Sequence, residues 1–376
     1  MTDTTTVANL PLNRDRPPAG SPEALPPAAL GDLERRQRET APPWGGALAD
    51  GVEVVSVAPR SGGVRSGRSA ADVERDTAAW AAALSAAGVS AGDACVTLLP
   101  PDGEGLGDVV RSGLARTGAQ VREQRGDLPR LAIAEQRQHP ARVLVASRTL
   151  ALALHSTVYA EFPLEPADLG FDLIVIAGET ATAGEVRRLD EEFEASVAQI
   201  ATGPLGQPIG VARGSATFAA VDGARVACWD GAAYVIGAPG DLVVTLAGVE
   251  AMPIVNLAVG LRGTVAADGS FSFSGEPSPG VGRIAHRLVV DEALGRVMRL
   301  VPGVADWRLE IARPGREDVV TLRIHASRDD FDPIARNARR ELAERLGLDV
   351  EVVVEPADAA APYGNGIAAG DADAAG

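Results

Sequence analysis

The order of secondary-structure signals between residues 52 and 195 constrains the fold of this chain most strongly. Short runs of branched apolar residues, such as 94–99 and 173–177, alternate with longer stretches of helical periodicity, such as 71–87 and 183–195. Strands separated by helices of this length predict a parallel sheet with helical crossovers. We therefore expect an α/β fold with a mixed arrangement of sheets and helices.

The pattern changes after residue 214. Short alternating runs between 221 and 273, separated by Gly, Asp and Pro, predict antiparallel strands that form a small sheet or barrel. After the Pro- and Gly-rich stretch 277–280, the signals follow the order strand, helix, strand, strand, helix, strand. This order predicts a small ferredoxin-like α+β domain.

These changes in pattern predict two domains and two tails. We expect a large domain over 29–280 and a small C-terminal domain over 281–356. The ends, 1–28 and 357–376, are rich in small residues and lack periodicity, so we expect both to be disordered.

Composition limits the partners and the compartment. The formal charge of −16 and the pI of about 4.8 argue against nucleic-acid and anionic-membrane partners, which would repel such a chain. Cys95 and Cys228 lie far apart in apolar surroundings, as buried free thiols do. With no signal-peptide pattern and no long apolar run, we expect a cytoplasmic protein.

Four stretches follow one another in the order and spacing of a known family. They are 88–93 (G-V-S-A-G-D), 176–180 (I-A-G-E-T), 251–255 (A-M-P-I-V) and 297–304 (V-M-R-L-V-P-G-V). Together they resemble the phenylacetate-coenzyme A ligase branch of the adenylate-forming (AMP-binding) ligases, over roughly residues 55 to 355. The resemblance implies a large N-terminal domain and a small mobile C-terminal domain. It also implies a site between them that uses ATP and Mg²⁺ to join a carboxylate to AMP.

The resemblance also points to residues of a nucleotide site. Ser61–Gly67 stands in the place of the family's phosphate loop, with Arg65 as the nearby cation. Backbone N–H groups of such a loop can bind an anion whatever its exact sequence, although a plain surface loop has the same composition. The vestigial phosphate- and nucleotide-binding positions implied by the resemblance are Ser61, Gly62, Gly63, Arg65, Gly67, Gly178, Glu179, Thr202 and Gly260.

Several residues that the family's chemistry requires are missing. The stretch 199–207 lacks the tyrosine and the magnesium-binding glutamate of the family's Y-G-x-x-E motif, and Leu261 replaces the ribose-binding aspartate. The hinge keeps Gly282 and Arg283 but loses its acidic pair. All 35 basic residues are arginine, so the family's C-terminal lysine is also absent. The four histidines are scattered, so we expect no metal site.

Three hypotheses follow. The leading one is a divergent, non-adenylating homologue that binds a small carboxylic or aromatic ligand, or a protein partner in a biosynthetic pathway. The second is an active ATP- and Mg²⁺-dependent ligase in which Arg65 and Arg283 clamp phosphates. The third is a structural or interaction subunit whose cleft is filled by apolar side chains such as Leu205 and Leu261.

Overall fold

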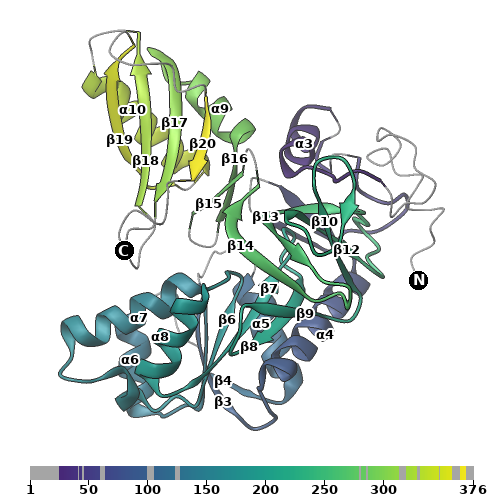
Figure 1. Ribbon diagram of the computed structural model, residues 1–376, viewed down its shortest axis with the longest axis vertical. Coiled ribbons are helices and arrows are strands. Elements are labelled where there is room, and N and C mark those ends of the chain that lie inside the picture. The colour runs from purple at the N-terminus through teal and green to yellow at the C-terminus, as the bar shows by residue number, and fades with distance from the viewer. Residues whose placement is uncertain are drawn as a thin grey trace.

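A computed structural model gives the arrangement of the chain (Figure 1). It describes residues 25–40, 42–44, 46–59, 64–99, 106–122, 128–278, 281–284, 287–312, 319–327, 331–346, 348–357 and 365–369. The first strands of the main sheet and their helices occupy the lower part of Figure 1, its last strands reach mid-height on the right, and the C-terminal unit, residues 281–369, extends to the top.

The first half of the main sheet is parallel. Its strands follow the order β7-β6-β5-β3-β4. Their bounds are Ala94–Leu98 (β3), Gln120–Arg122 (β4), Val143–Ala146 (β5), Leu173–Ala177 (β6) and Ser196–Thr202 (β7). This confirms the parallel sheet predicted from the alternating pattern.

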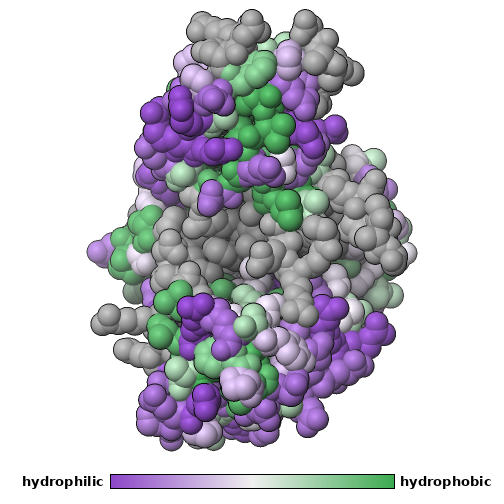
Figure 2. Space-filling model, turned by 90° about the vertical axis from the view of Figure 1, so that its left-hand side faces the viewer, coloured by the Kyte–Doolittle hydropathy of each residue, from purple (hydrophilic) through white to green (hydrophobic). Residues whose placement is uncertain are grey.

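Helices cover both faces of the parallel strands, which is why β5 and β6 are apolar throughout. On one face, α4 (Ala70–Ala87) and α5 (Leu106–Thr117) share a core with the sheet. On the other face lie α6 (Pro129–Gln138), α7 (Arg148–Glu161), the 3-10 helix η4 (Pro166–Leu169) and α8 (Ala183–Phe193). Figure 2 shows hydrophilic residues over much of the upper and lower parts of this face, with a hydrophobic strip in the upper part and smaller hydrophobic areas in the lower part.

The second half of the main sheet is antiparallel. Its strands are β8 (Pro208–Arg213), β9 (Thr217–Ala220), β10 (Ala224–Trp229), β11 (Tyr234–Val235), β12 (Gly240–Leu246), β13 (Leu257–Val265) and β14 (Phe271–Pro277). The antiparallel pairing agrees with the prediction, but these strands do not form a separate small sheet or barrel. Because β8 pairs antiparallel with β7, they continue the parallel half in the order β7-β8-β9-β14-β13-β12-β10-β11.

The C-terminal unit differs from the predicted ferredoxin-like order. Its four-stranded sheet has the order β19-β18-β17-β20. The bounds are Val304–Ala312 (β17), Val319–Ala326 (β18), Glu351–Pro356 (β19) and Gly366–Ala369 (β20), with helices α9 (Asp291–Arg299) and α10 (Phe331–Leu346) packed on the same core.

The first strand expected in this sheet lies elsewhere. Val281–Ile284 (β15) and Arg287–Val290 (β16) pair with each other in a two-stranded sheet. Strands so close in sequence pair at little entropic cost. The edge beside β17 is taken instead by β20, in parallel pairing. This strand lies in the stretch 357–376, so part of the tail expected to be disordered is an ordered strand.

The N-terminal elements lie against the antiparallel half. Helix α3 (Leu30–Arg35) continues into the π-helix η2 (Arg36–Thr40), and β1 (Ser56–Pro59) pairs with β2 (Arg65–Arg68). Ala28 forms a bridge to Leu257 and is buried, so the order begins before residue 29. Among the described residues, no helix is long and apolar enough to cross a membrane.

Candidate functional site

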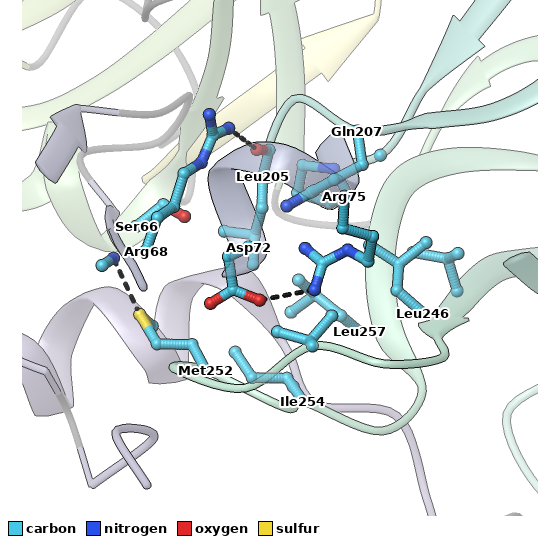
Figure 3. A pocket seen from close by; sticks show the side chains of 15 residues that line it. Ser66, Arg68, Asp72, Arg75, Leu205, Gln207, Leu246, Met252, Ile254 and Leu257 are labelled. Atoms are coloured by element: carbon cyan, nitrogen blue, oxygen red, sulfur yellow. Dashed lines mark hydrogen bonds and ion pairs between the residues drawn. The ribbon is translucent and has the colours of Figure 1, made fainter. Parts of the chain in front are cut away.

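A pocket lies where β2, the start of α4, the turn after β7 and the segment after β12 meet (Figure 3). It leaves about 20 Å³ for water-sized molecules, which is room for about one water. Most of its surface is apolar. The lining side chains include Ser66, Arg68, Asp72, Arg75, Leu205, Gln207, Leu246, Met252, Ile254 and Leu257.

Asp72 lines this pocket, and both of its carboxylate oxygens are bonded to other groups of the chain. It stands in the first turn of α4, in a capping box with Ser69, where the helix dipole favours negative charge. Its Oδ1 accepts the N–H of Glu250 (2.9 Å) and pairs with Arg75 Nη1 (2.5 Å). Its Oδ2 accepts the N–H groups of Ser69 (3.1 Å) and Ala251 (2.9 Å). Burial opposes ionisation, but these bonds and Arg75 lower the pKa of Asp72 below its usual value.

A second carboxylate completes the network. Asp76 lies 3.2 Å from Arg68 Nε and 2.7 Å from Arg75 Nη2, and its side chain is 1% exposed. Burial raises the pKa of Asp76, although both arginines oppose this shift. Arg68 also donates to the carbonyl oxygen of Leu205 (3.2 Å). Each guanidinium of the pocket therefore already binds a carboxylate of the chain itself.

The phosphate-loop positions are only partly described. Ser61, Gly62 and Gly63 lie outside the described residues. Arg65 begins β2 with an exposed side chain, and its backbone N–H (2.7 Å) and carbonyl (2.8 Å) both bond to the side chain of Gln37.

Gly67, the last residue of that loop, is enclosed by other side chains. Its N–H donates to Met252 Sδ at 3.1 Å (Figure 3). A side chain at this position would lie 2.9 Å from the ring of Trp44, so the ring packs directly against the glycine. The N–H of this loop position is therefore engaged within the chain.

Three positions implied by the resemblance come together at the ends of β6 and β7. The Thr202 hydroxyl donates to the carbonyl of Gly178 (3.2 Å), and Leu106 packs against the open face of Gly178. The Glu179 carboxylate, 2% exposed, accepts the N–H (3.0 Å) and hydroxyl (2.9 Å) of Thr149 at the start of α7. The Thr202 hydroxyl and the Glu179 carboxylate therefore form hydrogen bonds to other groups of the chain.

The remaining positions are less informative. Gly260 lies inside β13, where its carbonyl accepts the N–H of Ser278 (3.1 Å). Arg283 lies in β15, but its side chain is outside the described part. Leu205 and Leu261 are both 6% exposed, and Leu205 lines the pocket. Within the described ranges, no group of three or more His, Cys, Asp or Glu is placed to hold a metal ion.

Sequence reasoning missed the network of Arg68, Asp72, Arg75 and Asp76. The only local signal was Ser69 three residues before Asp72, which predicts a helix start. The partners at Glu250 and Ala251 are distant in sequence, and no local pattern connects them to α4.

Comparison with known proteins places the fold. No family model and no curated protein matches the chain. The chain is similar to the structure of 2-hydroxyisobutyryl-CoA ligase with 2-HIB-AMP and CoA in the thioesterification state, at 16% identity and a TM-score of 0.76, over 92% of this chain and 80% of that one.

Two further structures are similar. One is malonyl-CoA ligase with methylmalonyl-CoA and AMP bound, at 17% identity and a TM-score of 0.63, over 82% of this chain and 71% of that one. The other is o-succinylbenzoate CoA synthetase from Bacillus subtilis, at 13% identity and a TM-score of 0.62, over 81% and 67%. The chain therefore has the fold of the adenylate-forming ligases.

Proposed function

We propose that this protein does not adenylate a carboxylic acid and instead acts as an interaction protein built on the ligase fold, with a protein partner in a biosynthetic pathway. The observation that carries the proposal is the narrow pocket beside α4, which leaves space for about one water and whose two arginines, Arg68 and Arg75, already pair with buried carboxylates of α4.

The chemistry of adenylation makes this pocket unsuitable for it. A ligase must bind the ATP phosphates with N–H groups and cations, and neutralise the negative charge that develops on them. Here Asp72 takes the backbone N–H groups, and Asp72 and Asp76 take the guanidinium groups. A phosphate would have to displace a carboxylate, which would leave a buried charge without its partners at a cost of several kcal/mol.

Calorimetry and pyrophosphate release test the catalytic half of the proposal. The purified full chain is titrated with ATP, with AMP, and with each in the presence of Mg²⁺. It is then incubated with ATP and a panel of carboxylic acids. We expect no binding heat and no pyrophosphate above the protein-free blank. Acid-dependent release of pyrophosphate would overturn the proposal.

The second claim of the proposal, that the chain binds a protein partner, needs a separate measurement. Purified proteins encoded beside this chain are mixed with it one at a time and analysed by gel filtration. We expect one of them to co-elute as a stoichiometric complex. If every neighbour elutes separately, a small carboxylic or aromatic ligand becomes the better proposal, and a thermal-shift screen of such compounds tests it.

The second candidate is an active ligase in which Arg65 and Arg283 neutralise the phosphates. The exposure of the Arg65 side chain at the start of β2 favours it, because an exposed guanidinium is accessible to a phosphate. Should pyrophosphate be released, Arg65→Ala is expected to lower the rate at least tenfold. Arg35→Ala, which removes another exposed arginine, provides the control.

A further inference from the structure

The described residues between 25 and 49 (25–40, 42–44 and 46–49), which we term the strap, are bonded to the main sheet at the beginning of this segment. Ala28 donates its N–H to the carbonyl of Asn256 (2.8 Å) and accepts the N–H of Ala258 (3.0 Å). The carbonyl of Leu25 accepts from the side chains of Asn256 (2.8 Å) and Tyr234 (2.7 Å). Asn256 is fully buried and has a positive φ of 51°, a conformation that these bonds hold in place.

The strap is also attached along its length. Gln37 bonds twice to the backbone of Arg65, and Trp44 packs on Gly67. At its end, Ala49 donates to the carbonyl of Ala251 (2.9 Å). The strap is therefore bonded to, or packed against, residues beside the pocket at several points, among them Gly67 and Ala251.

One apolar cluster joins the strap to both parts of the molecule. It contains Leu30 and Leu33 of α3, Leu257 of β13, and Val290 and Ala293 of the C-terminal unit, all buried. Figure 1 shows α3 beside α9, and the two helices are in contact. A rotation of the C-terminal unit would expose this cluster to water, which is unfavourable in proportion to its area.

An ion pair crosses the same boundary. Glu34 of α3 pairs with Arg296 of α9, and their side chains are 7% and 22% exposed. If the helices separated, the Glu34 carboxylate and the Arg296 guanidinium would lose this pairing. A change of orientation must therefore break the apolar cluster and the ion pair together.

We infer that the strap locks the C-terminal unit in one orientation against the main sheet. Domains in one chain usually move relative to each other unless their interface is extensive and apolar. Here a segment from the start of the chain adds a third surface that binds both. This inference goes beyond the proposed function, because the lock would operate whether or not the protein binds a nucleotide.

Electron–electron distance measurements between spin labels test the lock. Cysteines are introduced by Arg187→Cys on α8 and Glu344→Cys on α10, two exposed positions on either side of the boundary. Native Cys95 and Cys228 are fully buried, and the unsubstituted chain reports any labelling of them. We expect a single narrow distance distribution in the full chain. Two or more distances would overturn the inference.

Variants of the ion pair between Glu34 and Arg296 test whether this pair holds the C-terminal unit in one orientation. Arg296→Ala removes the guanidinium that pairs with the buried Glu34 carboxylate across the boundary, so we expect a second distance population at least three times the wild-type background. The double variant Glu34→Leu with Arg296→Leu needs no partner charge and is expected to restore the single distance. Arg345→Ala, which removes the exposed 2.6 Å ion pair with Glu341 inside the C-terminal unit, is the control.

Circular dichroism establishes that each variant is folded. If Arg296→Ala loses its native spectrum, the milder Glu34→Gln takes its place. A folded variant with the wild-type distance distribution would show that the ion pair does not hold the unit, and would overturn the lock as described here.

Discussion

Replacing Asp72 with alanine should destabilise the protein more than any other single change in the pocket. The carboxylate accepts three backbone N–H groups, from Ser69, Glu250 and Ala251, and pairs with Arg75. Leaving three such donors without an acceptor costs at least about 1 kcal/mol each. Because breaking a buried ion pair costs about 3–5 kcal/mol in total, we expect a loss in that range.

That loss would be a large part of the 5–15 kcal/mol typical of a folded domain. Asp72→Asn keeps one acceptor oxygen, and in the wild type each oxygen accepts two of the four bonds. We therefore expect it to lose about half as much. The control is Asp108→Ala, which removes an ion pair whose carboxylate is 80% exposed.

Urea unfolding at pH 7 measures the free energy of unfolding of each variant relative to the wild type. Tryptophan fluorescence is a suitable probe because Trp80 is fully buried in α4, the helix that Asp72 begins. We expect the midpoint to fall for Asp72→Ala and to stay at the wild-type value for Asp108→Ala, with equal slopes. A loss below about 1 kcal/mol for Asp72→Ala would refute the reasoning, because it would mean that the four bonds contribute no more than one ordinary hydrogen bond.

Three further predictions follow from the structure. The pKa of Asp72 in the folded state lies below its usual value, so ionised Asp72 stabilises the fold fully above the unfolded pKa of about 4. This stabilisation is lost as the pH falls through the lower folded pKa. The melting temperature should therefore fall more steeply with decreasing pH for the wild type than for Asp72→Asn. Gly263→Ala would overlap the carbonyl of β14 and should cost about 3 kcal/mol, whereas Gly184→Ala at the open start of α8 should cost nothing in the same urea assay. Burial raises the pKa of Cys95 to about 12 and also raises that of Cys228, so Ellman's reagent at pH 8 should titrate neither thiol before urea is added and both afterwards; rapid reaction of the native protein would contradict their placement.

Sequence reasoning succeeded where local pattern and tertiary environment agree. The predicted helix 71–87 is observed as Ala70–Ala87, and the strand 173–177 is observed with the same bounds. Both faces of β6 are buried under helices, so every residue of the strand is apolar and the continuous apolar run predicted the strand correctly. The resemblance to adenylate-forming ligases likewise agrees with the fold, while the phenylacetate-coenzyme A ligase branch remains a proposal.

Sequence reasoning failed where a segment depends on distant partners. Gly366–Ala369 lacks any strand pattern, yet it forms β20 because β17 offers an open edge and Asp291 accepts the N–H of Ile367 (2.9 Å). The first strand predicted after the stretch 277–280 was expected to join that sheet, but residues 281–284 and 287–290 pair with each other instead. Both errors come from pairing, which periodicity does not encode.

The sequence by itself determined the α/β class and the start of α4, because the periodicity of apolar residues and helix capping depend on residues that are close together in the chain. The absence of lysine is read directly from the sequence. Only the tertiary structure decided that Asp72 and Asp76 pair with Arg68 and Arg75 at the pocket, and that the strap binds both parts of the chain. These contacts join segments up to 262 residues apart, as between Glu34 and Arg296, and form only when folding brings the segments together.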